Sequence, residues 1–237
     1  MNIKKQKSKI SERQKQILKA LMDKSFRQNE LQELLGITSP GLLYHLNNLE
    51  KYDLIIKETI QQIGNAKINE ISINTFQLQR IREILNLKIK NCTLITGFGE
   101  LGTGYQLPDA SSELLKKHHY KINRIVCFTT KKAEAIRNEK LKEEKLVKIH
   151  HYYHYDYEEY RNLNSSFFSD VDGIILEEIK EANLLIDITP LSKLYSFEML
   201  KKANKYGLLC FYIGQDEEGN DKLIWMSKIK IEGEMVQ

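Results

Sequence analysis

The 237 residues are 41% hydrophobic and 29% charged, the composition of a water-soluble chain with room for one or two domains. No apolar run approaches the roughly 18 residues of a membrane helix, and the first residues are polar rather than an apolar signal core. Cys92, Cys127 and Cys210 are odd in number and widely spaced. We therefore expect a cytoplasmic protein with buried thiols, no membrane segment and no metal site.

The net charge of +4 hides an uneven distribution along the chain. Residues 1–90 carry 16 Lys and Arg against 9 Asp and Glu, a balance of +7, and the remainder carries 20 against 23, a balance of −3. A basic first third is typical of a DNA-binding module attached to a domain of another kind. A solvated lysine-rich surface would have the same charge.

Two helices are predicted first. Ser11 followed three positions later by Gln14 predicts a capping box at the start of a helix. A second helix is expected over about residues 28–35, ending at Gly36, with Leu34 among its inward side chains.

A third helix and a hairpin follow. Thr38 or Ser39 is expected to cap the third helix, with Pro40 in its first turn. The β-prone residues 54–60 and 68–73 flank a Gly-Asn turn and predict a hairpin. Helix, helix-turn-helix and hairpin in this order predict a winged helix-turn-helix domain over residues 1–75.

The segment Leu34–Ile55 contains the phrase Tyr-His-Leu-Asn-Asn-Leu-Glu at residues 44–50. It resembles the winged helix-turn-helix of ArsR-type and MarR-type transcriptional regulators. The resemblance implies that the third helix enters the major groove of double-stranded DNA. The DNA-binding residues expected on this helix and the wing are Ser39, Gly41, Leu43, Tyr44, His45, Asn48, Lys57 and Lys67. A winged helix that docks a protein instead of DNA is the alternative.

Residues 76–90 predict a further helix, either a linker or a dimerising helix. After it, strands alternate with helices over residues 91–237, which predicts a Rossmann-like domain with a mostly parallel sheet. The whole chain is thus expected to be α/β, with a winged helix-turn-helix domain followed by a Rossmann-like domain. Ligands of such sheets bind at the carboxyl ends of the strands.

A glycine-rich segment follows the first strand of this second part. Gly97, Gly99 and Gly102 have the spacing of the dinucleotide fingerprint. Pro108 is expected to delay the next helix to Ser111 or Ser112, and no acidic residue ends the second strand to bind a ribose. Binding of NAD, as in redox regulators of the Rex type, is therefore the less favoured alternative.

The residues Asp187-Ile188-Thr189-Pro190-Leu191-Ser192-Lys193 follow a second apolar strand. They resemble the ligand motif of CARF domains (CRISPR-associated Rossmann folds), with Pro190-Leu191 in place of the usual glycine pair. The resemblance implies a cyclic oligoadenylate held across a dimer two-fold, and hydroxyls and a lysine at a helix start suit phosphates. The ligand-binding residues it implicates are Gly97, Phe98, Gly99, Glu100, Thr129, Thr189, Ser192 and Lys193, with Phe98 able to stack on a base.

The aromatic and imidazole cluster 150–157 is interpreted as an amphipathic strand, with metal binding as the weaker alternative. No Ser-His-Asp order, nucleophile elbow or paired carboxylates appear, so we expect no enzyme and no cofactor. Cleavage of the cyclic nucleotide by hydroxyl and basic groups of the loops is a minor alternative. The leading hypothesis is a homodimeric transcriptional regulator in antiviral defence, whose DNA affinity depends on a bound nucleotide second messenger.

Overall fold

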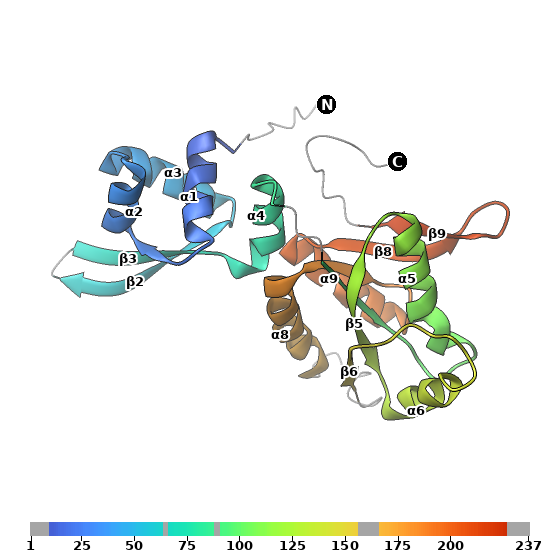
Figure 1. Cartoon of the computed structure of the whole chain (residues 1–237). Helices are drawn as coiled ribbons and strands as arrows, with labels where there is room; N and C mark the ends of the chain where they lie inside the picture. Colours follow the sequence, from blue (N-terminus) through green and yellow to red (C-terminus); the bar gives the residue numbers. More distant parts are fainter. Residues whose placement is uncertain (1–9, 64–65, 88–90, 156–165, 227–237) are drawn as a thin grey trace, which may run out of the picture. The chain divides into compact units, whose positions relative to one another are not determined.

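The computed structural model divides the chain into two compact units, Met1–Lys88 and Ile89–Gln237 (Figure 1). The residues that it describes are 10–63, 66–87, 91–155 and 166–226. Within these ranges, no helix is both long enough and apolar enough to span a membrane.

The first unit consists of helices that pack on a small antiparallel sheet. Its elements are α1 (Glu12–Leu21), β1 (Phe26–Arg27), α2 (Gln28–Leu35), α3 (Ser39–Lys51), β2 (Ile55–Ile63), β3 (Ala66–Ile73), a 3-10 turn (Thr75–Gln77) and α4 (Leu78–Ile84). The strand order is β1-β3-β2, so the short β1 adds to the free side of the β2–β3 pair. The Gly-Asn turn expected between β2 and β3 lies outside the described residues.

Local signals fix the helix ends of this unit. The Ser11 hydroxyl accepts a hydrogen bond from the Gln14 N–H at 3.2 Å, and the Gln14 side chain accepts one from the Ser11 N–H at 2.8 Å. This confirms the predicted capping box. Gly36 ends α2 in the left-handed conformation, with φ of 58°, which glycine adopts without the clash that a Cβ would cause.

The core of the first unit is built from one face of each helix and of the sheet. The fully or nearly fully buried side chains are Ile17, Leu18, Leu21, Leu31, Leu42, Leu46, Leu49, Leu54, Ile55, Ile71 and Ile81. The expectation that Leu34 points inward is wrong, since 58% of its surface is exposed. The helix expected over residues 76–90 is also shorter than predicted: α4 ends at Ile84 and buries Ile81 in this core.

The second unit is a mixed α/β fold around one six-stranded sheet. Its elements are β4 (Cys92–Gly97), a 3-10 turn (Gly104–Gln106), α5 (Leu107–Lys117), β5 (Ile122–Thr129), α6 (Lys131–Lys140), β6 (His151–His154), α8 (Ser166–Glu181), β7 (Asn183–Asp187), α9 (Lys193–Tyr206), β8 (Leu209–Gln215) and β9 (Asp221–Trp225). The strand order is β6-β5-β4-β7-β8-β9. Every neighbouring pair is parallel except β8 and β9, so the predicted mostly parallel sheet is confirmed.

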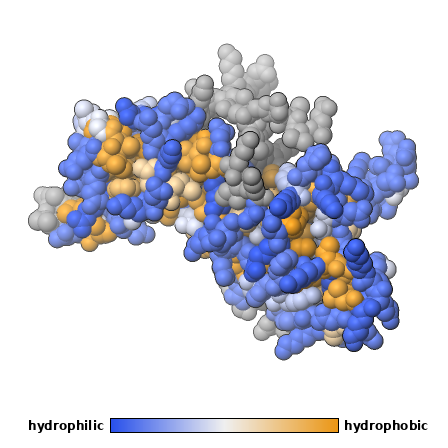
Figure 2. Space-filling view, viewed as in Figure 1, coloured by the Kyte–Doolittle hydropathy of each residue, from blue (hydrophilic) through white to orange (hydrophobic). Residues whose placement is uncertain are grey.

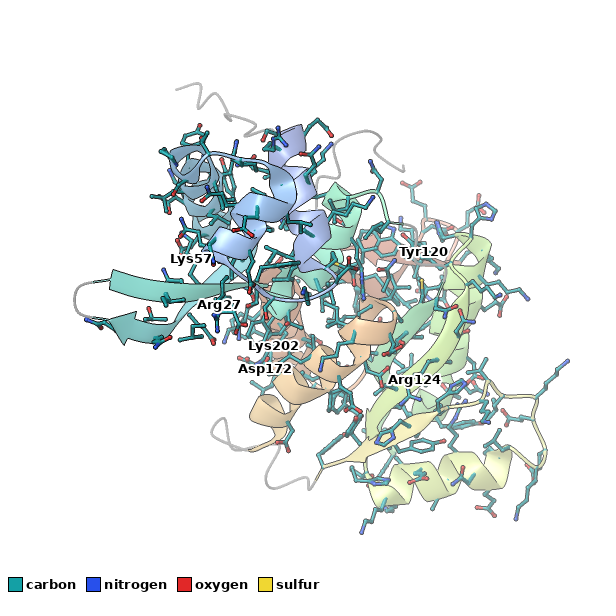
Figure 3. All side chains as sticks on the ribbon, turned by 60° about the vertical axis from the view of Figure 1, so that its left-hand side comes forward. Arg27, Lys57, Tyr120, Arg124, Asp172 and Lys202 are labelled. Atoms are coloured by element: carbon teal, nitrogen blue, oxygen red, sulfur yellow. The ribbon has the colours of Figure 1, made fainter. Side chains whose placement is uncertain are left out.

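Helices cover both faces of this sheet, with α5 and α6 on one side and α8 and α9 on the other (Figure 1). Strand residues such as Leu94, Cys127 and Phe211 belong to the same buried hydrophobic cluster as Leu115 of α5. Between α8 and α9, Asp172 forms an ion pair with Lys202 at 2.6 Å (Figure 3). The sheet is therefore covered on both faces, which leaves its strand ends and its edges as the accessible parts.

The predicted start of the helix that follows the glycine-rich segment is wrong. We expected Pro108 to delay the helix to Ser111 or Ser112, but α5 begins at Leu107 with the proline in its first turn. Proline is tolerated there because the first N–H groups of a helix have no intrahelical partner. A loop and a 3-10 turn still separate Gly97 from this helix, so α5 does not open at the glycines as the dinucleotide fingerprint requires.

Candidate functional site

The exposed face of α3 is the candidate nucleic-acid surface of the first unit. Ser39, Leu43 and Tyr44 are exposed, with 45% of the surface of Leu43 and 66% of that of Tyr44 accessible. Leu43 and Tyr44 are thus two large hydrophobic side chains exposed on this face, and Figure 2 shows hydrophobic areas on the surface of the first unit. Ring and aliphatic groups on a helix can contact base edges, above all the thymine methyl group.

Three further residues predicted on this helix lie at its flanks. Gly41, His45 and Asn48 are half-buried, so each presents only part of its surface to solvent. A Cβ on Gly41 would lie 3.1 Å from the Thr38 hydroxyl, which explains a small residue at this turn. The Nδ1 atom of His45 is buried and has no hydrogen-bond partner among the described residues.

Lys57 was predicted to contact DNA from the wing, but its ammonium group is bound within the first unit. Its ammonium donates hydrogen bonds to Asn47 Oδ1 and Glu50 Oε2, both at 2.7 Å, and only 13% of its side chain is exposed (Figure 3). Lys57 therefore joins β2 to α3 and has its charge matched by Glu50. Lys67 lies in β3 opposite Gln62, and its side chain is outside the described residues.

In the second unit, the candidate ligand site lies between β4 and β7, where the order in which successive strands are added to the sheet changes from one side of β4 to the other. The strand β4 pairs with β5 on one side and with β7 on the other, and all three are parallel. The segments that follow β4 and β7 therefore leave the same edge of the sheet next to each other. In open α/β sheets this topological switch point is where ligands bind.

Gly97 brings these two segments into contact. A Cβ at this position would lie 2.8 Å from the Phe128 carbonyl oxygen and 3.0 Å from Leu191 Cδ1. Only glycine leaves room for both neighbours. Leu191 itself has a φ of 67°, a left-handed conformation that favours glycine. The backbone thus has a glycine-type turn where the CARF motif has its glycine pair, although the residue is leucine.

Phe98 does not serve the role expected of it. Its side chain is fully buried in the core, 6.4 Å from the Tyr152 ring, so it offers no free ring face to a base. Its carbonyl accepts a hydrogen bond from the Thr129 hydroxyl at 2.9 Å. Thr129 is fully buried as well. Both residues anchor the loop after β4 and leave none of their side-chain surface to a ligand.

Glu100 lies in the same loop and points toward the start of α6. Its carboxylate accepts a hydrogen bond from the Thr130 hydroxyl at 3.0 Å and forms an ion pair with Lys132 at 2.7 Å. The hydrogen bond from Lys132 contributes most to lowering the pKa of this carboxyl group. Glu100 thus remains an anion, and its charge is matched by Lys132.

Asp187, the first residue of the second motif, is fully buried at the end of β7. It accepts hydrogen bonds from the hydroxyls of Thr96, at 2.9 Å, and Ser111, at 2.5 Å, and from the Thr189 N–H at 2.8 Å. Burial raises its pKa, and these hydrogen bonds oppose the rise. Asp187 therefore ties β4, α5 and the loop after β7 together, and sequence patterns contained no signal for its two hydroxyl partners.

Among the other motif residues, the hydroxyls of Thr189 and Ser192 form hydrogen bonds within the fold, whereas Lys193 is exposed. Thr189 Oγ1 accepts a hydrogen bond from the Ile213 N–H at 2.8 Å, and Ser192 caps α9 by accepting one from the Tyr195 N–H at 3.4 Å. Lys193, the first residue of α9, is exposed and has no ion-pair partner among the described residues. It is the motif residue with a charge available to an incoming anion.

The net charge of this end of the sheet is positive. The segments 98–106, 130–132 and 188–193 contain three lysines and one acidic residue, namely Lys131, Lys132, Lys193 and Glu100. Since Glu100 is paired with Lys132, two lysine charges are unmatched within these segments. This balance favours an anionic ligand.

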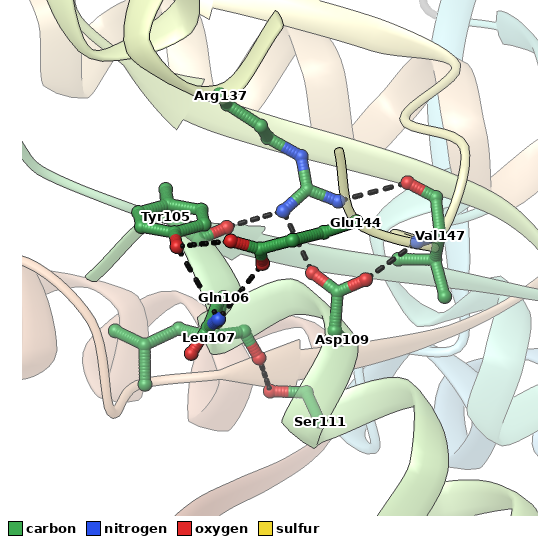
Figure 4. A network of polar contacts seen from close by, with 8 residues as sticks. All are labelled: Tyr105, Gln106, Leu107, Asp109, Ser111, Arg137, Glu144 and Val147. Atoms are coloured by element: carbon green, nitrogen blue, oxygen red, sulfur yellow. Dashed lines mark hydrogen bonds and ion pairs between the residues drawn. The ribbon is translucent and has the colours of Figure 1, made fainter. Parts of the chain in front are cut away.

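A buried charged network supports the loop after β4, and sequence reasoning missed it (Figure 4). Arg137 of α6 is fully buried; it donates hydrogen bonds to the Tyr105 carbonyl, to Asp109 at 2.7 Å and to the Val147 carbonyl at 2.8 Å. Its guanidinium also lies 5.7 Å from the centre of the Phe98 ring. A single arginine in a lysine-rich helix gives no sequence sign that it is buried.

The strand expected in the aromatic and imidazole cluster 150–157 is the shorter edge strand β6, His151–His154, and residues 156 and 157 lie outside the described residues. Its two histidines are the more exposed and its two tyrosines are half-buried, so burial does not alternate along it as in an amphipathic strand. The His151 and Tyr153 rings lie on one face with their centres 4.3 Å apart and their planes tilted by 45°, and the Tyr152 and His154 rings lie on the other, 6.3 Å apart and nearly parallel. His154 also pairs with Glu134. Among the residues that the structure describes, no group of three or more His, Cys, Asp or Glu side chains could hold a metal ion.

Comparison with known proteins gave few matches. No protein-family model matches the sequence, and no curated protein matches it. Among solved structures, the chain is similar to Can2 from Sulfobacillus thermosulfidooxidans in complex with cyclic tetra-adenylate, with 15% sequence identity and a TM-score of 0.36. The match covers 55% of this chain and 36% of the Can2 chain, so it spans little more than a third of that protein.

This finding corrects one expectation. The lack of a known catalytic arrangement in the sequence led us to predict that the chain is not an enzyme. Can2 was solved in complex with cyclic tetra-adenylate, and beside this finding the exclusion of an enzyme does not stand. The prediction was wrong to exclude catalysis, and we withdraw it.

Proposed function

We propose that this chain is a nucleotide-responsive, DNA-binding transcriptional regulator. Its second unit is a CARF-like domain that binds a cyclic oligoadenylate or a related nucleotide, and its first unit is a winged helix-turn-helix that binds double-stranded DNA. The observation that carries the proposal is the contact of the loops after β4 and β7 at Gly97 and Leu191, with Lys193 exposed beside them. Such a regulator belongs in antiviral defence.

The ligand part of the proposal rests on charge and position. The loops meet at the topological switch point of a parallel sheet, where this class of fold binds ligands. The unmatched charges of Lys131 and Lys193 attract phosphates, and the start of the 14-residue helix α9 adds its dipole. The second strand, β5, ends at Thr129 and is followed by Thr130 and Lys131, so the acid that binds the ribose of NAD is missing.

The DNA part rests on the order of elements in the first unit. A helix pair joined through Gly36, followed by the β2–β3 pair, is the order of a winged helix, and α3 exposes Ser39, Leu43 and Tyr44. Two such units in a homodimer would contact half-sites about one helical turn apart. A cyclic ligand held between two CARF-like domains, as the resemblance implies, requires the same dimer.

Binding of cyclic tetra-adenylate tests the ligand part. At about 100 times its Kd, a ligand stabilises the folded state by about 2.7 kcal/mol, which raises the Tm of a domain of this size by about 5 °C or more. We expect this rise with cyclic tetra-adenylate and none with NADH. Lys193→Gln should weaken the binding by about 10-fold or more, because a charge-assisted contact is lost.

Lys201→Gln is the matched control, since Lys201 lies on the same helix but pairs with Glu198. It should bind the nucleotide like the unmodified chain. A Tm rise with NADH and none with cyclic tetra-adenylate would instead support a redox regulator of the Rex type. Chromatography of the recovered nucleotide shows whether it is bound intact or cleaved to linear product, which separates a sensor from a ring nuclease.

A further inference from the structure

The outward face of α3 carries no charged side chain over its first turns. The residues from Ser39 to Leu49 include no Asp, Glu, Lys or Arg. The largest exposed side chains of this stretch are Leu43 and Tyr44, with 45% and 66% of their surface accessible. Residues four positions apart lie on the same side of a helix, so Ser39, Leu43 and Asn47 follow one another along the outward face. This face therefore meets a partner with apolar groups at its centre.

Two residues of α3 that suit base recognition, Asn47 and Glu50, are bound within the first unit. Lys57 of β2 donates hydrogen bonds to Asn47 Oδ1 and to Glu50 Oε2, both at 2.7 Å. In the major groove, asparagine recognises adenine through a pair of hydrogen bonds that includes its side-chain oxygen, and a carboxylate recognises cytosine by accepting from its amino group. Both roles use an oxygen that here accepts from Lys57.

Guanine also lacks its usual partner on this face. It is recognised chiefly by Arg or Lys, and α3, all of which the structure describes, has a single such residue, Lys51, at its last position. Base edges are contacted by the N-terminal part of a recognition helix instead. There Ser39 exposes a hydroxyl, which can serve more than one base, and the large exposed groups are those of Leu43 and Tyr44.

An apolar side chain matches one base in particular. Thymine alone presents a methyl group on its major-groove edge, and leucine can pack against it without leaving a polar group unpaired. Leu43 lies one turn after Ser39. The neighbouring Tyr44 ring packs edge-on against the His45 ring, with their centres 5.4 Å apart, which restricts the ring next to Leu43.

We infer that the outward face of α3 recognises thymine methyl groups in the major groove, and that Leu43 makes the contact that determines this specificity. The preferred duplex then has an A·T pair opposite Leu43 in each half-site. This inference rests on the proposed DNA-binding function and adds to it the base that the helix reads. Contacts of other residues with phosphates add affinity but do not select thymine.

The test compares thymine with uracil, which lacks only the methyl group and keeps the same hydrogen-bonding edge. The full chain first selects a duplex from a random-sequence pool, and fluorescence anisotropy then gives its affinity for that duplex made with thymine and made with uracil. The uracil duplex should bind about 4-fold more weakly for each methyl group that α3 buries. Leu43→Ala should bring the two affinities close together, and Leu43→Met should keep the difference, because a long apolar side chain remains.

Leu34→Ala is the matched control. Leu34 is another exposed leucine of the first unit, with 58% of its surface accessible, but it lies on α2. Its variant should keep the preference for thymine. Alanine is the best helix former, so both alanine variants should keep the helical circular dichroism of the unmodified chain.

Three other results would contradict the inference in different ways. Equal affinities of the unmodified chain for the thymine and uracil duplexes would overturn it while the DNA-binding function stands. A preference for thymine that Leu43→Ala leaves intact would remove Leu43 from the contact. If the selection enriches no duplex, the proposed DNA-binding function itself fails, and the apolar face of α3 docks a protein instead.

Discussion

At the scale of single residues, Asp187 shows that a ligand motif can also serve the fold. Its carboxylate is buried and accepts hydrogen bonds from Thr96, Ser111 and the Thr189 N–H. Asp187→Ala removes the acceptor of the Thr96 hydroxyl and of the Thr189 N–H, whereas the Ser111 hydroxyl keeps the Leu107 carbonyl at 3.0 Å. An unsatisfied buried group costs about 1–3 kcal/mol. We expect a loss of about 2–4 kcal/mol in the free energy of unfolding, measured by urea denaturation.

Asp187→Asn tests the effect of the charge at this position, because asparagine keeps a side-chain oxygen that accepts hydrogen bonds but does not ionise. Burial raises the pKa of Asp187 above its ordinary value of 3.8, so the folded state holds this proton more tightly than the unfolded state does. The contribution of Asp187 to stability is therefore greatest below pH 3.8 and falls as the pH rises through the raised pKa of the folded state. The asparagine variant should lack this fall, and its stability relative to the unmodified chain should increase with pH. A constant difference across that range would contradict the assignment.

At the same scale, residue types alone did not predict which candidates reach solvent. Thr189, Ser192 and Lys193 were chosen for one chemistry, yet both hydroxyls bind within the fold and only the lysine is exposed. Phe98 and Lys57 likewise have partners in the core or on a neighbouring element. These partners lie far away in sequence, so local patterns carry no information about them.

At the scale of elements, most helices and strands were predictable because their signals are local. The capping box at Ser11 and the left-handed Gly36 set helix ends through their own neighbours. The wrong predictions concern the length of a helix and the burial of a side chain, which tertiary packing determines. α4 stops at Ile84, and Leu34 is exposed despite its helical spacing.

Gly97 offers a test of how the loops after β4 and β7 meet. A Cβ there would lie 2.8 Å from the Phe128 carbonyl oxygen and 3.0 Å from Leu191, so the alanine variant must push backbone or loop aside. We expect Gly97→Ala to cost about 1–3 kcal/mol in thermal or urea unfolding, as overpacking does. A Cβ on Gly99 meets nothing within 4 Å, which makes Gly99→Ala the matched control with little change expected. Equal effects of the two substitutions would show that the loops do not approach as described.

At the scale of the whole molecule, composition, charge and pattern change together near residue 90, and the chain divides into the units Met1–Lys88 and Ile89–Gln237. The ion pair of the buried Arg137 with Asp109 could not be predicted from the sequence, since it depends on how α5 and α6 pack on the sheet. Local periodicity predicts a fold class and the position of its loops. It does not predict which charged side chains the assembled layers bury.

If both proposed sites exist in one chain, their coupling is measurable as an equilibrium. Should cyclic tetra-adenylate change the affinity for a DNA duplex by a given factor, the duplex must change the affinity for the nucleotide by the same factor. For a regulator we expect a factor of about 5–150 in either direction, measured by anisotropy for DNA and by calorimetry for the nucleotide. Lys193→Gln should weaken nucleotide binding and leave DNA affinity in the absence of nucleotide unchanged. A factor of one would mean that the two units bind their partners independently and would remove regulation from the proposed function.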